Sequence, residues 1–479
     1  MPRWRGERDA TRSGPACPQP PRRPGSIYAS PLAATSEDCL YLDIWAPEDA
    51  RDLPVLVWIH GGSLIWGAGS EPYYDGSELA RRGVVVVSIN YRLGIFGYLA
   101  HPELSAESPN GISGNYGLLD QIAALQWVRD NIAAVGGNPG QVTIAGESAG
   151  GLSVLYLMAS PGARGLFHGA IAQSSYLIST PALGGEVNGH EPAEAAGARL
   201  AVRLGAAGIA DLRAMDAQAL ADGALREGFA VLGAIDGGVL PGQLVDVFER
   251  GEQARVPLIV GFNSGEMKSL PFLLPSLPAT AGEYESEIHN RYGDLSDRFL
   301  SLYPSSDIRE SAFAAVRDAL YGWTAMKLAE AQKAAGLPAY IYYFDHGYPA
   351  ARQAGLHGFH ACELPYVFGT PGRVPPLWPA APDTEVEREL SRAIGDYWVS
   401  FAQGRAPASR GFADWPDWSK TGRHLRFDDV PRDEAALLPG MYALNDDVIR
   451  RRREAGSVPW HWNVGVAAPL PEKDLPIDD

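Results

Sequence analysis

The sequence predicts an α/β fold in which helices cover both faces of a central, mostly parallel, twisted sheet. Residues 55–60 and 84–90 form two almost continuously apolar runs, as strands do when both faces of a sheet are covered. Helical stretches alternate with such runs along the chain, and this alternation is typical of a parallel sheet.

The clearest helix is expected over residues 116–135. Apolar residues recur there at spacings of three and four, which places them on one face. They are Leu118, Ile122, Leu125, Val128 and Ile132. The run GGNPG at 136–140 ends this helix, because neither glycine nor proline continues a helix comfortably.

The rest of the chain continues the alternation of strands and helices. Residues 176–255 are rich in alanine and mainly helical, and we interpret them as an insertion over the sheet. The further strands are expected at 142–145, 169–173, 256–262, 339–344 and 424–428, and the further helices at 152–159 and 384–403.

Composition excludes several classes of function. The chain of 479 residues has 40 basic and 57 acidic residues, and a net charge of −17 disfavours binding to nucleic acid. No apolar stretch reaches the roughly 18 residues that a membrane span needs. The three cysteines are too few for a disulfide scaffold or a multi-cysteine zinc module.

The first residues are basic and rich in proline, and residues 1–35 are expected to be irregular. They contain no apolar core of a secretory signal peptide. The sequence therefore predicts a cytoplasmic protein by default, or a secreted one if the true start lies upstream.

The strongest functional signal is the G-x-S-x-G motif that centres on Ser148. It follows an apolar strand and precedes an apolar helix, which is the context this motif requires. A sharp strand-to-helix turn lifts the serine hydroxyl clear of the sheet and points the helix N-terminus at it. We therefore predict that Ser148 is a nucleophile.

A glycine-rich loop follows the strand at 55–60 and begins with His60. Acyl transfer needs backbone N–H groups that converge on the oxyanion of a tetrahedral intermediate. We predict that Gly62, Ser63 and Ala149, the residue after the nucleophile, supply these donors.

The mechanism also needs an acid and a histidine, which should follow the serine in that order. Glu266 lies just beyond the strand-like run that ends near residue 263. His360 stands out among the later histidines because it follows the strand at 339–344.

Several segments together resemble the type-B carboxylesterase family, a branch of the α/β-hydrolases. They are SEDCLYLDIWAP (36–47), HGGSLIWGAGS (60–70), NYRLGIFGYL (90–99), the long block 114–151, DGGVLP (236–241), GFNSGE (261–266) and HACELPYVFG (360–369). The resemblance extends over nearly the whole chain from about Trp4. It implies a serine esterase that needs no cofactor or metal and acts on small-molecule esters, as a monomer or homodimer.

Carried over to this chain, the resemblance implies that Ser148 is the nucleophile, Glu266 the acid and His360 the base. It also implies that Cys17 and Cys39 can form a disulfide, which requires an oxidising compartment. The third cysteine, Cys362, is expected to be buried and reduced.

The chain departs from the family pattern in three places. The acid motif lacks the Asp before the acid and has Met267 where the family has glycine, and Ser63 replaces a more usual glycine or alanine. The family's first hairpin, which normally precedes the point that matches Trp4, is expected to be missing.

The motifs are spread so widely that one catalytic body is expected over residues 36–479, with helical insertions at about 176–255 and 270–335 that form the pocket wall. By position alone, Leu64, Trp66, Met267 and Phe272 are candidates for contact with the substrate.

Four other points stay open. An amidase or thioesterase could use the same triad, and catalytically inactive binding scaffolds occur in this family, although they lose a member of the triad. His357, His360 and Glu363 have the spacing of a metal-ligand run, but no further ligand cluster accompanies them. Glu147 could be a buried partner of the histidine, or it could be structural.

Overall fold

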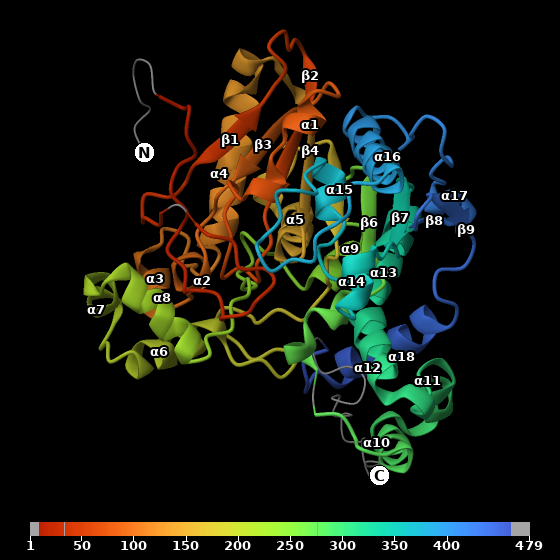
Figure 1. Cartoon of the computed structure of the whole chain (residues 1–479). Helices are drawn as coiled ribbons and strands as arrows, with labels where there is room; N and C mark the ends of the chain where they lie inside the picture. Colours follow the sequence, from red (N-terminus) through yellow and green to blue (C-terminus); the bar gives the residue numbers. More distant parts are fainter. Residues whose placement is uncertain (1–8, 33, 275, 461–479) are drawn as a thin grey trace.

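A nine-stranded sheet forms the centre of the computed structural model, which describes residues 9–32, 34–274 and 276–460 (Figure 1). The strands lie in the order β1-β3-β2-β4-β5-β6-β7-β8-β9. Their bounds are β1 Leu42–Trp45, β2 Leu53–Ile59, β3 Val85–Ile89, β4 Gly137–Glu147, β5 Gly169–Gln173, β6 Leu258–Asn263, β7 Ala339–Phe344, β8 His424–Phe427 and β9 Arg432–Glu434.

All neighbouring strands from β3 to β8 run parallel, which confirms the predicted sheet. The two edge strands, β1 and β9, are antiparallel to their neighbours and were not predicted. They are only four and three residues long and are partly exposed, so they lack the apolar run that identifies a central strand.

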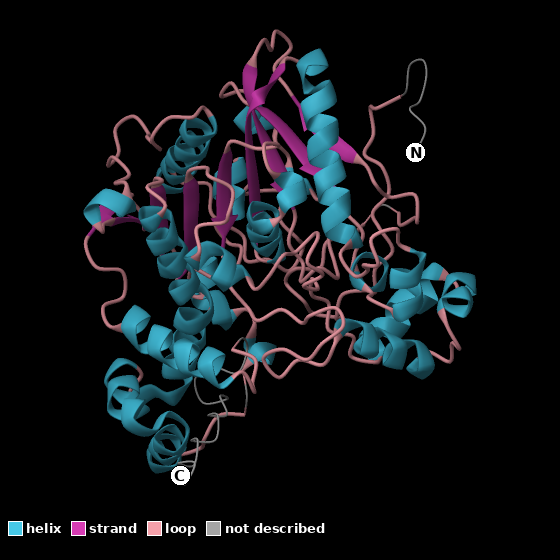
Figure 2. Ribbon diagram, turned by 180° about the vertical axis from the view of Figure 1, so that it is seen from behind, coloured by secondary structure: helices cyan, strands magenta, loops and turns pink. Residues whose placement is uncertain are grey.

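Helices cover both faces of the sheet (Figure 2). They are α1 Ser77–Ala80, α2 Gly94–Tyr98, α3 Pro102–Glu107, α4 Tyr116–Asn131, α5 Ala149–Ala159, α6 Ala193–Arg203, α7 Ile209–Ala214, α8 Ala217–Arg226, α9 Leu244–Glu249, α10 Ala281–Tyr292, α11 Ser296–Leu302, α12 Ile308–Arg317, α13 Trp323–Ala334, α14 Pro349–Gln353, α15 Leu364–Phe368, α16 Glu385–Ala402, α17 Trp418–Thr421 and α18 Met441–Ala455. Among the described residues, none of these helices could cross a membrane.

Two apolar cores lie on opposite faces of the sheet. Successive side chains of a strand point to opposite faces. Val57 of β2 therefore belongs to the core that includes residues of α4, α5 and α13, whereas Trp58 belongs to the core that includes residues of α15 and α16. Residues 55–59 are all buried between the two faces, which explains why this part of the run is apolar throughout.

Two expected element boundaries differ from the structure. The glycine-rich run at 136–140 does end the helical residues, but the strand predicted at 142–145 is longer and already includes residues 137–140. The helix predicted from residue 152 begins at Ala149, because the three residues before Leu152 are small and carry little apolar signal.

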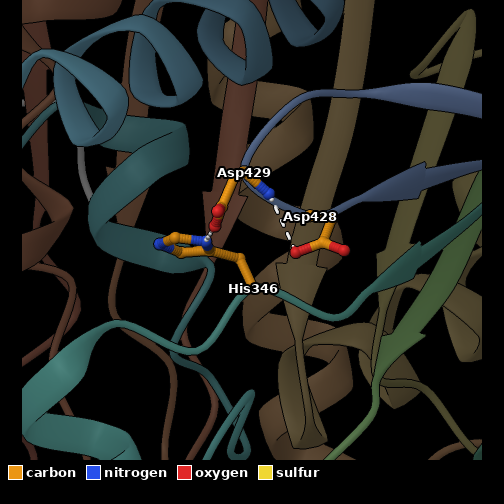
Figure 3. Close-up of side chains that lie close together, drawn as sticks. All are labelled: His346, Asp428 and Asp429. Carbon is orange, nitrogen blue, oxygen red and sulfur yellow. Dashed lines mark hydrogen bonds and ion pairs between the residues drawn. The ribbon is translucent and has the colours of Figure 1, made fainter.

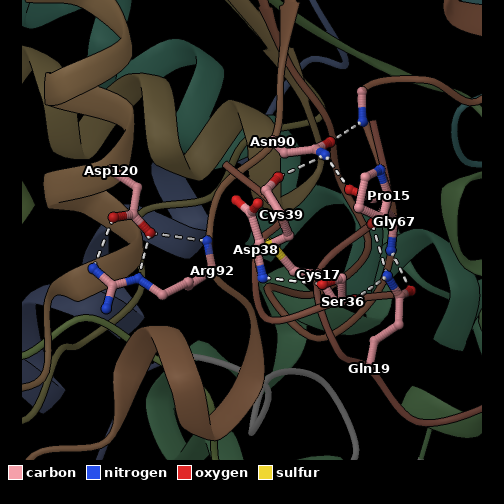
Figure 4. Close-up of a disulfide and its surroundings, with 11 residues drawn as sticks. Pro15, Cys17, Gln19, Ser36, Asp38, Cys39, Gly67, Asn90, Arg92 and Asp120 are labelled. Carbon is pink, nitrogen blue, oxygen red and sulfur yellow. Dashed lines mark hydrogen bonds and ion pairs between the residues drawn. A yellow bond between two sulfur atoms is a disulfide. The ribbon is translucent and has the colours of Figure 1, made fainter. Parts of the chain in front are cut away.

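The N-terminal segment is irregular but firmly held (Figure 4). A disulfide joins Cys17 to Cys39, just before β1, while Cys362 is buried and free. The Gln19 side-chain amide donates to the Gly67 carbonyl oxygen at 2.9 Å and accepts from the Gly67 N–H at 2.8 Å. These bonds fasten the segment to the loop after β2. Residues 1–8 lie outside the described residues.

We predict that replacing both bonded cysteines, Cys17→Ser with Cys39→Ser, lowers the thermal unfolding midpoint. Closing a loop with a sequence separation of 22 residues stabilises the folded state by about 3 kcal/mol in the chain-entropy model. Calorimetry with and without dithiothreitol measures this effect. Wild-type protein should lose stability on reduction and the double variant should not; equal midpoints in all four samples would contradict the prediction.

Candidate active site

Ser148 occupies a sharp turn between β4 and α5. Its backbone has φ 57° and ψ −121°, a conformation that a residue with a side chain adopts only under strain. Its N–H donates to the Gln173 carbonyl oxygen of the neighbouring strand β5 at 2.9 Å, which holds the turn. The hydroxyl therefore stands at the C-terminal end of the sheet, as the motif predicted.

The glycines around Ser148 are required by close approach of the backbone. A Cβ atom on Gly150 would lie 2.0 Å from the carbonyl oxygen of Ile59, and one on Gly146 would lie 2.5 Å from the carbonyl carbon of Gly150. Both separations are far below van der Waals contact. Strand β2, strand β4 and helix α5 can therefore meet at this point only without these side chains.

The loop after β2 presents backbone N–H groups beside the serine. Gly62, Ser63 and Leu64 all have positive φ, and a Cβ on Gly62 would meet the Trp66 carbonyl oxygen at 2.1 Å. Among the described residues, the N–H groups of Gly62, Ser63 and Ala149 have no hydrogen-bond acceptor. Such unsatisfied donors are what an oxyanion hole offers.

His360 and Glu266 are joined by a hydrogen bond of 2.5 Å between Nδ1 and Oε2. Glu266 is fully buried, and its other oxygen accepts from the Asn263 N–H and from the Ser174 hydroxyl, both at 2.7 Å. The N–H of Gly265 donates to the Gly358 carbonyl oxygen, which ties the two loops together. Two fixed donors thus leave one carboxylate oxygen aimed at the imidazole.

A second carboxylate faces the other side of the same imidazole. Oε1 of Glu147 lies 3.1 Å from Nε2 of His360, and both side chains are almost fully buried. The Ser148 hydroxyl makes no hydrogen bond within the described part of the chain, although Ser148 and His360 line one cavity. Glu147 was interpreted either as a partner of the histidine or as a structural residue. Its contact with His360 shows that it is a partner of the histidine.

Charge in this cluster moves two pKa values strongly. Burial lowers the pKa of His360, but the charges of Glu147 and Glu266 outweigh it and raise the pKa to about 9. Burial raises the pKa of Glu147 to about 8, although the charge of His360 opposes this. Perturbed values of this size are typical of functional sites.

Three supporting residues, Ser174, Asn263 and Tyr28, escaped the sequence analysis, whereas Glu363 was named there. Ser174 and Asn263 hold Glu266, and Tyr28 donates to the carbonyl oxygen of His360 at 3.0 Å. Glu363 accepts from the side chains of Asn263 and Gln173 at 2.6 and 2.9 Å, and burial raises its pKa. The only available signal was that Asn263 ends strand β6 and Ser174 directly follows strand β5.

A cavity of about 530 Å³ opens at this site. Trp66 and Phe272 line it, as expected, and Phe272 is 66% exposed. The expectation for Leu64 and Met267 was wrong, because both are 1% exposed and pack into the core of the α4 and α5 face. Position beside a functional residue did not show which way either side chain points.

The three residues whose spacing resembled a metal-ligand run do not converge on one point. His357 bonds to Asp345 at 2.9 Å, His360 faces the two glutamates, and Glu363 bonds to amide groups. None of the three shares a ligand position with the others among the described residues.

A different group, His346 with Asp428 and Asp429, has the proximity that a metal site needs (Figure 3). Its histidine nitrogens are already engaged, Nδ1 with Asp429 at 2.9 Å and Nε2 with Glu387 at 3.0 Å. We interpret this cluster as a polar junction between the ends of β7 and β8 and helix α16.

Comparisons with known proteins agree on one family. The family described as "Carboxylesterase family" matches residues 1–438. The chain is 37% identical over 441 residues to a fumonisin B1 esterase of Sphingopyxis macrogoltabida, covering 88% of this chain and 78% of the relative. It is 36% identical over 436 residues to the para-nitrobenzyl esterase of Bacillus subtilis, covering 88% of this chain and 84% of that protein.

Solved structures agree with the sequence relatives. A para-nitrobenzyl esterase structure has a TM-score of 0.75 at 34% identity, with 88% of this chain and 86% of that chain covered. A carboxylesterase of Geobacillus stearothermophilus has a TM-score of 0.75 at 32% identity, with 92% and 90% covered.

We predict that Gly150→Ala destabilises the protein by more than about 3 kcal/mol, because the added methyl group collides with a backbone oxygen that cannot move aside. Urea unfolding followed by circular dichroism measures this loss. The matched control is Gly185→Ala, where the added Cβ meets no atom within 4 Å. Equal stability of the two variants would contradict the prediction.

Proposed function

Since the chain belongs to the carboxylesterase family, we propose that it hydrolyses esters through an acyl-enzyme on Ser148, with His360 as base and Glu266 as the acid that orients it. The observation that carries this proposal is the 2.5 Å hydrogen bond from His360 Nδ1 to Glu266, in the cavity that Ser148 also lines. The chain is a carboxylesterase with an α/β-hydrolase fold; the assignment of these roles is the proposal.

In acylation, the Ser148 oxygen attacks the ester carbonyl carbon, and Nε2 of His360 takes the hydroxyl proton. Because Nδ1 donates to Glu266, the lone pair of a neutral imidazole is on Nε2, where the reaction needs it. Nε2 lies 3.1 Å from Oε1 of Glu147 and must turn toward the Ser148 hydroxyl when substrate binds. Catalytic hydrogen bonds commonly form only in the substrate complex.

The carbonyl oxygen becomes an oxyanion in the tetrahedral intermediate. The unsatisfied N–H groups of Gly62, Ser63 and Ala149 support a role as its hydrogen-bond donors. They are fixed by the positive-φ loop and by the start of α5, so they need no rearrangement as the charge develops.

Collapse of the intermediate breaks the bond to the alcohol, which leaves with the proton held by His360. Water then attacks the acyl-enzyme carbonyl carbon, gives a proton to His360, and releases the acid as Ser148 regains its proton. Throughout, the charge of Glu266 stabilises the imidazolium, and the donors from Asn263 and Ser174 keep that carboxylate in place.

We predict that Ser148→Ala lowers kcat for p-nitrophenyl butyrate by about 10⁴-fold or more, because no nucleophile remains. A fluorophosphonate probe should label wild-type protein at Ser148, as peptide mass spectrometry would show. Ser153→Ala is a suitable control, since Ser153 lies one turn along α5 and bonds to the Ala149 carbonyl oxygen. Wild-type activity in Ser148→Ala, or labelling elsewhere, would refute the proposal.

We predict that Glu147→Gln moves the acidic limb of the kcat/KM profile to lower pH by about one pH unit. Activity rises with pH as His360 loses its proton, and the charge of Glu147 raises the pKa of this histidine. Removing that charge therefore frees the base at lower pH. The control is Glu107→Gln, an exposed residue paired with Arg213. An unchanged or alkaline-shifted limb would contradict the prediction.

A further inference from the structure

We propose that the outer part of the catalytic cavity binds carboxylate, so that the preferred esters carry a second, ionised carboxylate away from the bond that is cleaved. The inference rests on the proposed function and adds a substrate class to it. It depends on Arg22 and Arg23, which the N-terminal segment places in the cavity wall.

Each arginine is held over an aromatic ring of the same wall. The Arg22 guanidinium carbon lies 5.5 Å from the centre of the Trp66 ring, and that of Arg23 lies 5.9 Å from the centre of the Phe272 ring. Stacking on a ring fixes the plane of a guanidinium and leaves its edge N–H groups available. The Trp66 indole N–H also donates to the Pro20 carbonyl oxygen at 2.9 Å, which secures the segment beside Arg22.

Neither arginine forms an ion pair with a described carboxylate, although burial raises the pKa of Glu71 and the charge of Arg22 opposes that rise. Among the described residues, no ion pair within 4.0 Å joins a carboxylate oxygen to the guanidinium of Arg22 or Arg23. Lys268, the third cation of the cavity wall, differs in this respect because it pairs with Glu310 at 2.9 Å. The two arginines therefore offer N–H donors to a ligand, and Arg23 also offers charge that no described carboxylate shares in an ion pair.

The cavity has opposite charge at its two ends. Glu147 and Glu266 lie around His360 in the buried interior, whereas Arg23 and Phe272 are exposed at the open end. A carboxylate would be repelled at the buried end and attracted at the open end. An anionic ester is therefore oriented with its reacting bond toward Ser148 and its free carboxylate toward the arginines.

Carboxylate fits this site better than a diffuse anion does. The planar guanidinium forms two parallel N–H···O bonds with a carboxylate, which gives direction as well as charge. The overall charge of −17 does not prevent binding, because salt screens charges beyond about 10 Å at 0.1 M while the arginines act at contact distance.

The test compares three p-nitrophenyl esters of similar length by kcat/KM: mono-p-nitrophenyl adipate, its ω-methyl ester, and an analogue that ends in trimethylammonium. The structure predicts that the anionic ester is preferred over the methyl ester by about ten-fold, chiefly through KM, and that 0.5 M NaCl reduces this preference. The cationic ester should be the poorest of the three.

Variants assign the preference to the two arginines. In Arg22→Gln with Arg23→Gln, the ratio of anionic to methyl ester should fall to about one, and Arg22→Lys with Arg23→Lys should retain part of it, because charge remains and the planar fork is lost. The matched control is Arg129→Gln, an exposed arginine of α4 paired with Asp130, which should keep the wild-type ratio.

The outcomes separate this inference from the proposed function. Cleavage of the methyl ester without preference for the anionic one, or a preference that survives in the double Gln variant, overturns the carboxylate site alone. Failure to cleave any of the three esters, together with no fluorophosphonate labelling of Ser148, overturns both.

Discussion

The close approach of three backbone segments at Ser148 is the constraint on which the rest of the structure depends. The Ile59 carbonyl oxygen at the end of β2 lies where a Cβ of Gly150 would be, so β2, β4 and α5 converge with no side chain between them. This contact places the glycine-rich loop after β2 beside the serine. At the same point Ser148 has a strained φ, which the neighbouring strand β5 holds through a backbone hydrogen bond. The scaffold thus carries the strain that exposes the hydroxyl.

Much of this arrangement could be predicted because its physical causes are local in sequence. A glycine is recognisable where a backbone oxygen approaches too closely for a side chain, and a run of apolar residues is recognisable where a strand is buried on both faces. Both patterns lie within a few residues of sequence. Glu266 and His360 were identifiable for a related reason: both follow parallel strands, whose carboxyl ends meet at one edge of the sheet. The distance of 2.5 Å between His360 Nδ1 and Glu266 Oε2 depends on contacts such as that between Gly265 and Gly358. No local sequence pattern encodes such contacts.

The parts that could not be predicted depend on side-chain direction or on contacts between distant segments. Leu64 and Met267 are neighbours of functional residues, yet both point into the core. The edge strands β1 and β9 are defined by a partner strand and not by an apolar run. The main feature that the sequence analysis missed is the contribution of the N-terminal segment to the cavity wall, because its composition indicated only an irregular segment. That contribution follows from bonds such as those between Gln19 and Gly67.

The charge of the cavity illustrates why overall composition is a poor guide to a binding site. An acidic chain suggests affinity for cations, but a substrate within the cavity responds to the groups in contact with it. There, Glu147 and Glu266 face His360, while Arg22 and Arg23 lie over aromatic rings and form no ion pair with a carboxylate in the part of the chain that the structure describes. The segment that carries these arginines is also the one that the disulfide and the Gln19 bonds hold in place. An otherwise irregular stretch is therefore restrained where the cavity opens, and a rigid support is what a charged group needs in order to orient a substrate and not merely attract it.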